Sequence, residues 1–328
     1  MTDHAAGSAS GQTDRGLPPV VRGRYLPLAL LGEGASTRVY RAYDVDSGRD
    51  VALQILRDDP DLGPIRRRFL GAARAVIEIR HPAVVRCLDA GETAAGQPFA
   101  VMELLRGETL GAHLARVGRL PWRAALPLFL DAAAGLSALH RAGLVHRDVK
   151  PDNLFLLGPP GAPERLKVLD FGLSKRVQGG VEPGQPWVVG TTEYMPPEQV
   201  LCDPVDARSD VYALGAVLFR ALTGELPFAE VPRNRVLAHH LVTPAPPPSW
   251  LVEDLPPGLA AVVATALRKH PDNRFATMDA MARALGSGTV ADGLPFEAPP
   301  LRRDPDRYEP RREHASEVLR ALGESVAA

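Results

Sequence analysis

The chain has 328 residues and a net charge of −1, with 45% apolar and 23% charged residues. This composition is typical of a globular protein and excludes disorder of the whole chain. The near-neutral charge gives no basic excess for nucleic acid or a membrane surface, and no apolar run approaches the length of a membrane span. Two cysteines cannot form a disulfide framework, so we expect a soluble, cytoplasmic protein in a reducing compartment.

The N-terminal part is predicted to be mainly β structure. Residues 1–23 are rich in Gly, Ser and Asp and are predicted to be a disordered arm. In residues 24–105, short β-branched runs are broken by turn residues and interrupted by one predicted helix at Ile65–Ile79. The predicted strands are Arg38–Ala42, Asp50–Leu56 and Pro98–Leu104, with a hairpin turn at Asp46–Gly48 between the first two.

Residues 106–286 are predicted to be mainly helical. In Ser209–Thr223, apolar residues recur at intervals of three and four, which predicts a helix with one apolar face. Ala124–Arg141 is also predicted to be a helix, with Pro127 as an irregularity near its start.

The C-terminal residues 287–328 are rich in Pro, Arg and Asp and are predicted to be a tail. The spacing of Val318, Leu322 and Val326 favours one short amphipathic helix over His314–Ala327, which alone would be marginally stable. We interpret this helix as a candidate docking element for a partner.

A glycine-rich segment, LGEGASTRV, occupies residues 31–39 between two predicted strands. Glycines such as Gly32 and Gly34 let backbone N–H groups approach phosphate oxygens without a Cβ in the way. Such a turn is also ordinary in a hairpin that binds nothing, so this segment alone leaves nucleotide binding open.

A second motif, HRDVKPDN, occupies residues 146–153. It places Asp148, which can accept a hydroxyl proton, two residues before Lys150, and Asn153, which can bind a metal, follows three residues later. Seventeen residues beyond Asn153 begins the sequence Asp-Phe-Gly, whose Asp170 is a second candidate metal ligand. The order and spacing of these motifs make the combination far more specific than any one of them.

Together the motifs resemble those of the eukaryotic-type (Hanks-type) serine/threonine protein kinase family, in its bacterial branch. The likeness covers about residues 24–286. It implies an α+β, two-lobed protein-kinase fold, with a small mainly-β N-lobe over 24–105 and a larger mainly-α C-lobe over 106–286. It also implies ATP and Mg²⁺ as cofactors and a protein substrate or regulated partner. From the charge and the apolar runs, we expect no nucleic acid or membrane partner.

Further landmarks agree with the resemblance. Met102 stands at the family's gatekeeper position. Residues 190–198, GTTEYMPPE, resemble the substrate-facing loop and its closing motif. Asp210 resembles the residue that anchors the catalytic loop, and Arg274 resembles the ion-pair partner of Glu198.

The resemblance implies a role for each site residue. Asp148 would be the catalytic base and Lys150 a phosphate contact, and Thr191 would bond both side chains. Asn153 and Asp170 would be the magnesium ligands. The residues implied for the nucleotide are Leu31, Gly32, Gly34, Val39, Ala52, Gln54, Met102, Glu103, Leu105 and Phe155. The alternatives are a polar network inherited with the fold and, for the apolar residues, ordinary core packing.

The sequence departs from the family pattern at three positions. Gln54 occupies the place of the strand lysine that binds the α- and β-phosphates, and Ala72 occupies the place of the glutamate that pairs with it. The third glycine of the loop is replaced by Thr37. The first two losses are mutually consistent, because a buried glutamate without its lysine would be an uncompensated charge.

No other lysine can take over this role from a neighbouring strand, because Lys150 is the first lysine of the chain. Only arginines such as Arg38 or Arg41 remain, and we interpret both as solvated strand residues. Glu78 cannot replace the missing glutamate, because six residues correspond to about 600° around a helix, which is a different face.

Regulation is also predicted to be unusual. Residues 175–190 contain no Ser, Thr or Tyr, so phosphorylation of this segment cannot be the switch. Glu182 is a candidate fixed anionic partner for Arg147, although a solvated loop charge is the simpler interpretation.

Two functions remain open. The first is a Ser/Thr protein kinase of reduced efficiency, because losing one charged donor typically costs about 10²–10³ in rate. The second is a pseudokinase, which would act as a nucleotide-responsive or purely protein-binding module. The retained Asp148, Asn153 and Asp170 favour the first function, whereas Gln54 and Ala72 favour the second.

Overall fold

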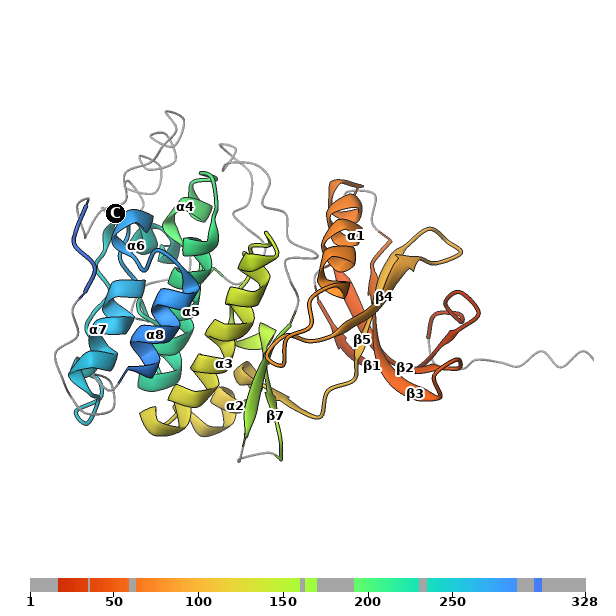
Figure 1. Ribbon diagram of the computed structural model, residues 1–328, viewed down its shortest axis with the longest axis horizontal. Coiled ribbons are helices and arrows are strands. Elements are labelled where there is room, and N and C mark those ends of the chain that lie inside the picture. Colours follow the sequence, from red (N-terminus) through yellow and green to blue (C-terminus); the bar gives the residue numbers. More distant parts are fainter. Residues whose placement is uncertain are drawn as a thin grey trace, which may run out of the picture.

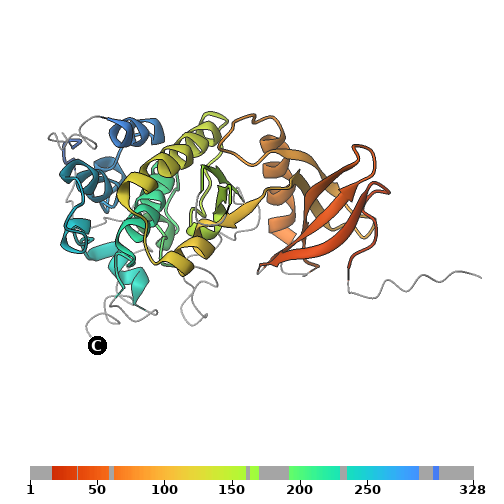
Figure 2. The same cartoon turned by 90° about the horizontal axis from the view of Figure 1, so that it is seen from below.

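The computed structural model describes residues 17–34, 36–58, 63–159, 163–169, 192–229, 235–287 and 298–302. The chain forms two lobes, one with an antiparallel sheet and one helix, the other mainly of helices (Figure 1). The view from below shows the sheet lobe at one end of the molecule (Figure 2). The α+β, two-lobed fold predicted from the sequence is confirmed.

Five antiparallel strands form the sheet of the N-lobe, in the spatial order β1-β2-β3-β5-β4. They span Tyr25–Glu33 (β1), Thr37–Asp44 (β2), Arg49–Leu56 (β3), Cys87–Glu92 (β4) and Pro98–Glu103 (β5). Because β3 is the central strand, every residue from Val51 to Leu56 is buried. The predicted hairpin turn joins β2 to β3, with Gly48 at a φ of +66°.

Helix α1 (Gly63–Ile77) packs on the N-lobe sheet through apolar side chains. Phe69, Ala73 and Val76 lie at helical spacing and are at most 1% exposed. Ala72 is partly buried against the same core. Among the described side chains of α1, none forms an ion pair with the sheet.

Residues 17–23 differ from the predicted disordered arm. Val21 is 3% exposed and packs in the core with Tyr25 and Val51. Its main chain is also bound, since Val21 N donates to Tyr25 O at 2.9 Å and Tyr25 N donates to Val21 O at 3.0 Å. Burial of an apolar side chain therefore extends the N-lobe to before residue 24. The earlier part of the predicted arm lies outside the described residues.

The C-lobe is built of helices and one small antiparallel sheet. The helices are α2 (Leu110–Val117), α3 (Trp122–Arg141), α4 (Pro197–Val200), α5 (Ala207–Thr223), α6 (Val236–Val242), α7 (Pro257–Ala266) and α8 (Met278–Gly286), with short 3₁₀ helices at Pro151–Asn153, Pro248–Trp250 and Pro271–Asn273. The sheet comprises β6 (Gly107–Thr109), β7 (Leu154–Leu157) and β8 (Arg165–Val168).

Helix α5 is buried nearly all round, not on one face as its periodicity predicts. Tyr212 and Phe219 are fully buried, and the polar Ser209 and Asp210 are 1% exposed. The helix runs through the centre of the lobe against α3, α7 and α8, so each of its sides contacts protein. The polar residues of its first turn are satisfied by hydrogen bonds within the site described below.

Helix α3 continues through Pro127 and lies against the N-lobe at Gly135. A Cβ built at Gly135 would lie 2.4 Å from the main-chain oxygen of Ala83, so only glycine allows this approach. Next to it, Val168 N donates to Ala83 O at 2.9 Å and Val85 N donates to Val168 O at 3.0 Å. These contacts fasten the segment before β4 to the C-lobe.

Residues 298–302 lie against the C-lobe. Arg268 Nη1 donates to Pro299 O and to Asn273 O, both at 2.8 Å. The main-chain N–H of Arg302 donates to Asn273 Oδ1 at 2.7 Å. These residues of the predicted tail are therefore hydrogen-bonded to the C-lobe through their main chain.

The predicted tail helix, His314–Ala327, lies outside the described residues. Within the described ranges, no helix is long and apolar enough to cross a membrane. The same ranges contain no cluster of three His, Cys, Asp or Glu side chains suited to a metal ion.

Candidate active site

The loop at residues 146–153 is anchored by Asp210, in the first turn of α5. The Asp210 carboxylate accepts the backbone N–H groups of His146 at 2.8 Å and Arg147 at 2.9 Å. His140, near the end of α3, bonds the same carboxylate through Nε2 at 2.7 Å. Three partners thus hold a buried carboxylate in place, and this is the anchoring that the resemblance implies for Asp210.

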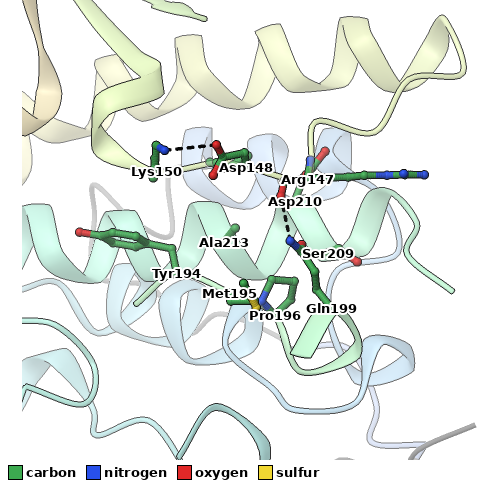
Figure 3. A pocket seen from close by; sticks show the side chains of 11 residues that line it. Arg147, Asp148, Lys150, Tyr194, Met195, Pro196, Gln199, Ser209, Asp210 and Ala213 are labelled. Atoms are coloured by element: carbon green, nitrogen blue, oxygen red, sulfur yellow. Dashed lines mark hydrogen bonds and ion pairs between the residues drawn. The ribbon is translucent and has the colours of Figure 1, made fainter. Parts of the chain in front are cut away.

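Arg147 has a φ of +64°, in the left-handed region that only glycine adopts readily. Its N–H is held by Asp210, and its carbonyl accepts a 3.1 Å hydrogen bond from Gln199 Nε2 (Figure 3). A strained backbone of this kind costs about 1–3 kcal/mol and persists only where its surroundings enforce it. Glu182, the candidate partner of the exposed Arg147 side chain, lies outside the described residues.

Asp148, Lys150 and Asn153 lie together in this loop. Lys150 Nζ is 3.2 Å from Asp148 Oδ2, and Figure 3 shows the two side chains pointing toward each other. Asn153 is 5% exposed and donates from Nδ2 to Asp148 O at 2.7 Å. Because its nitrogen is committed to the loop, Asn153 keeps its Oδ1 atom as an acceptor, which is the atom that a hard cation requires.

The same loop is bonded to the end of β8. Leu169 N donates to Asn153 O at 2.8 Å, and His146 Nε2 bonds Leu169 O at 2.7 Å. Leu169 directly precedes Asp170 in the sequence. Asp170 and Thr191 themselves lie outside the described residues, so their roles stay predictions.

Four of the predicted nucleotide contacts belong to one apolar cluster: Val39, Ala52, Met102 and Leu105. Ala52 and Met102 are direct partners on β3 and β5. Two further residues lie outside this cluster. Leu31 is 53% exposed near the end of β1, and Phe155 is partly buried on β7 of the C-lobe.

Gly32 lies near the end of β1, opposite Val39 of β2, and Gly34 lies in the turn that follows; both are exposed. Gly34 N donates to Thr37 O at 2.8 Å, which closes the turn. A Cβ built at Gly32 would meet no atom within 4 Å. Packing within the protein therefore does not demand glycine there, and open space remains for a ligand to approach the backbone.

Gln54 lies at the centre of β3 and is 1% exposed. Its Nε2 atom donates to Thr37 Oγ1 at 3.4 Å. Ala72, on α1, has only a methyl group and can offer no polar contact to β3. The buried polar side chain of β3 is therefore bonded to the β1–β2 hairpin.

Arg38 and Arg41 lie on the outer side of β2. Arg38 pairs with Glu33 at 3.0 Å and Arg41 pairs with Asp50 at 3.0 Å. Their side chains are 45% and 49% exposed. The prediction that both are solvated strand residues is confirmed.

Glu103, at the end of β5, connects the two lobes. Its carboxylate accepts the backbone N–H of Arg86 at 2.8 Å and is paired with Lys167 Nζ, on β8 of the C-lobe. Its own N–H donates to Arg86 O at 3.0 Å. The side chain thus braces the connection between the lobes, in addition to any backbone contact with a nucleotide.

Glu198 and Arg274 form a buried bidentate ion pair, with both nitrogen–oxygen distances at 2.8 Å. Ser209 Oγ donates to the same carboxylate at 2.6 Å. Burial by itself raises the pKa of Glu198, but the charge and hydrogen bonds of Arg274, with Ser209, outweigh it and hold the pKa below its usual value. The pairing that the resemblance implies is confirmed.

A small pocket lies between the catalytic loop and the segment that precedes α4 (Figure 3). One wall contains Asp148 and Lys150, and the other contains Tyr194, Met195 and Pro196. A group held in this pocket would therefore lie beside the Asp148 carboxylate.

Three site residues were not found from the sequence: His140, Gln199 and Lys167. Each acts through one contact with a residue at least 52 positions away. Such contacts leave no periodic pattern. Only the position of Gln199 directly after Glu198, in the loop-closing motif, offered a signal.

Comparison with known proteins places the chain among bacterial relatives. A sequence profile of the protein kinase domain matches residues 25–285. The serine/threonine-protein kinase PknB of Mycobacterium leprae is 38% identical over 295 residues, covering 88% of this chain and 46% of that protein. PknA of Mycobacterium tuberculosis is 36% identical over 270 residues, covering 81% of this chain and 61% of that protein. The chain thus spans about half the length of these curated relatives.

The fold also matches a solved structure. The crystal structure of the Mycobacterium tuberculosis PknI kinase domain aligns with a TM-score of 0.64 and 27% identity. The alignment covers 81% of this chain and 96% of that domain.

Proposed function

The chain belongs to the protein kinase family and carries a bacterial serine/threonine protein kinase domain, and we propose that it transfers the γ-phosphoryl group of Mg-ATP to protein hydroxyls with reduced efficiency. One observation carries this proposal. Asp148, Lys150 and Asn153 lie together in a loop whose backbone is fixed by the buried Asp210. A pure binding module has no need of this arrangement.

Each residue has a distinct part in the reaction. Asp148 accepts the proton of the attacking serine or threonine hydroxyl. Lys150, held 3.2 Å from it, offers an ammonium group to the transferred phosphoryl oxygens. Asn153 Oδ1, together with Asp170, would hold magnesium, which neutralises charge on the phosphates when bound.

The described residues fit Mg-ATP on two grounds. The Asn153 amide commits its nitrogen to the loop and keeps an oxygen for the cation. The backbone beside Gly32 faces open space, and the apolar cluster of Ala52 and Met102 supplies the environment that a flat base requires.

The reduced efficiency rests on Gln54 and Ala72, which we take to replace the strand lysine and its helix glutamate. A neutral amide donates roughly half as strongly as a charged group. The loss of one such donor costs about 10²–10³ in rate, equivalent to about 2.7–4 kcal/mol. Arg38 and Arg41 cannot compensate, because each is already paired on the outer side of β2.

A second candidate is a pseudokinase, favoured by one observation. The Gln54 amide is 1% exposed and is bonded to Thr37 within the protein. A residue that serves only the fold would have the same environment. In this alternative the domain presents its surface to a regulated partner and transfers nothing.

The deciding experiment measures phosphoryl transfer from Mg-ATP to the protein itself and to a Ser/Thr-containing protein substrate. The variants are Asp148→Asn and, as a control, Asp254→Asn, which changes an exposed carboxylate in the C-lobe. Transfer that is lost in the first variant and kept in the second supports the kinase. Equal signals in all three proteins would assign the pseudokinase function.

The control of activity follows the same proposal. Residues 175–190 have no hydroxyl to phosphorylate, so we propose that activation does not depend on a phosphate there. Mass spectrometry of active protein checks this, because an activating phosphosite at Ser174 or Thr192 would contradict it. The substrate and the cytoplasmic location stay predictions.

A further inference from the structure

Two of the departures from the family pattern, Thr37 and Gln54, contact each other. They lie on neighbouring strands as diagonal neighbours, because Thr37 is opposite Leu56 and Gln54 is opposite Val39. Only a long side chain can bridge this separation. Gln54 does so, with its Nε2 atom 3.4 Å from Thr37 Oγ1, and the two residues are 1% and 8% exposed.

The Thr37 hydroxyl also borders the glycine turn. It lies 3.7 Å from the position of a Cβ built at Gly34. The main chain of Thr37 closes the same turn, since its carbonyl accepts the N–H of Gly34 at 2.8 Å. Thr37 therefore connects the turn, through its main chain, with Gln54, through its side chain.

The outer side of the hairpin is tethered to the end of β3. Arg57 N donates to Ser36 O at 2.8 Å, and Arg57 pairs with Glu33 at 3.3 Å. Both side chains of that ion pair are 40% exposed, and exposed ion pairs contribute little. The buried Thr37–Gln54 contact is thus the side-chain interaction best placed to hold the hairpin over β3.

We propose that Thr37 is a positioning residue for the nucleotide. Through Gln54 it fixes the glycine-rich hairpin over β3, so that the backbone N–H groups of the turn are held ready for the phosphates. This inference rests on the proposed function, which names Mg-ATP as the ligand. The buried polar residue of β3 serves the hairpin, while α1 packs on the sheet through apolar side chains and bonds the β4–β5 turn through Arg66 and the Gly96 carbonyl.

The advantage of this arrangement is preorganisation. A hairpin already held in its binding geometry loses less conformational freedom when a ligand arrives. Such a hairpin partly compensates for the weaker neutral donor at Gln54. A hydroxyl at position 37 is essential to this arrangement, and a glycine there could not provide it.

Four variants test the pair. Thr37→Val removes the hydroxyl and keeps the shape, whereas Thr37→Ser keeps the hydroxyl. Gln54→Met keeps the length and removes the amide, and the fourth variant combines it with Thr37→Val. The control is Thr223→Val, in the C-lobe, because Thr223 is also 8% exposed and its hydroxyl is also hydrogen-bonded.

Binding of a fluorescent ATP analogue with Mg²⁺ is the first measurement. We expect Thr37→Val and Gln54→Met each to weaken binding by about 3- to 10-fold, the range for loss of one hydrogen bond. The double variant is expected to bind no more weakly than the worse single variant, and Thr37→Ser is expected to bind like the natural protein. Thr223→Val is expected to lower the melting temperature without changing binding.

Additive losses in the double variant, a Thr37→Ser variant as weak as Thr37→Val, or unchanged binding in both single variants would overturn the proposal. In a transfer assay, Thr37→Val should raise KM for ATP and leave kcat unchanged. A fall in kcat alone would assign Thr37 to the chemical step and contradict a positioning role.

Amide hydrogen exchange of residues 32–38 separates this inference from the proposed function. A natural protein that binds no nucleotide contradicts the proposed function, and exchange still decides whether the pair holds the hairpin. Faster exchange in both single variants, with no further increase in the double variant, supports the pair. Unchanged exchange in the single variants overturns it.

Discussion

Gln199 donates a 3.1 Å hydrogen bond from its side-chain nitrogen to the main-chain carbonyl of Arg147. Gln199 lies in α4, and Arg147 lies in the loop at residues 146–153 with a φ of +64°. Gln199 is only 8% exposed, so water cannot easily replace this hydrogen bond. The two loops that flank the Asp148 carboxylate are thus fixed relative to each other.

Substitution of Gln199 is predicted to affect stability and transfer together. Gln199→Met removes the donor and is expected to cost about 0.5–1.5 kcal/mol of unfolding free energy. Gln199→Glu also places a carboxylate against the Arg147 carbonyl and is expected to cost more. Urea unfolding and the transfer assay measure both effects, with Gln97→Met as a control on the N-lobe. Full transfer activity in Gln199→Glu would contradict this role.

The Glu198–Arg274 pair is predicted to be costly to break from one side. Arg274→Met leaves a buried carboxylate without its partner, and the expected loss is about 3–5 kcal/mol of unfolding free energy. Adding Glu198→Gln should recover part of it, because the uncompensated charge is removed. Chemical denaturation of the single and double variants measures these unfolding free energies.

The matched control for that pair is Arg165→Met. Arg165 pairs with Asp131 at 2.8 Å, but its side chain is 55% exposed. An exposed pair contributes about 0–1 kcal/mol. Equal losses in Arg274→Met and Arg165→Met would show that burial does not decide the strength of these pairs.

His240 is predicted to make stability depend on pH. Burial, with the nearby charge of Lys269, lowers the pKa of His240 from 6.5 to about 3. Between these pH values the unfolded chain binds more protons than the folded one. The free energy of unfolding is therefore unaffected by His240 above pH 6.5. As the pH falls from 6.5 toward 3, the free energy of unfolding declines by at most about 1.4 kcal/mol per pH unit.

The test compares unfolding free energies at pH 7 and pH 5. His240→Asn keeps an acceptor for the Tyr212 hydroxyl, which lies 2.8 Å from His240 Nδ1, and removes the titration. We expect a shallower pH dependence in the variant. An equal change in unfolding free energy between the two pH values in both proteins would mean that other groups account for the pH dependence. Such groups include His81 and His239, whose pKa values are also lowered by burial.

Restoring a lysine at position 54 is predicted to be harmful unless α1 changes as well. Gln54→Lys places an ammonium group at a site that is 1% exposed, and such an unpaired charge costs about 3–5 kcal/mol. Adding Ala72→Glu should recover most of this loss and raise the transfer rate. Arg74→Glu is the control, because Arg74 is exposed and lies two residues, about 200° around α1, from Ala72. A stable Gln54→Lys variant would show that the site already contains a counter-charge.

Much of the site could be predicted from short-range patterns. The HRDVKPDN sequence fixes the spacing of Asp148, Lys150 and Asn153, because all three belong to one loop. The pairing of Glu198 with Arg274 followed from their motifs. Short β-branched runs between turn residues predicted the strands.

Other features depend on contacts that sequence patterns do not express. The burial of α5 on every side arises from three helices that pack around it, and periodicity alone shows only its most apolar face. Val21 is buried because it pairs with Tyr25, although its neighbours have the composition of an arm. The contact of Thr37 with Gln54 joins two departures from the family pattern that appear independent in the sequence.

The close approach of Gly135 to Ala83 determines how the lobes can move. A side chain cannot be inserted there, and the adjacent main chain is hydrogen-bonded to Val168. We expect any motion between the lobes to pivot at this point, where the N-lobe main chain is bound to α3 and β8. Such a pivot changes the angle between the two lobes and keeps Ala83 beside Gly135.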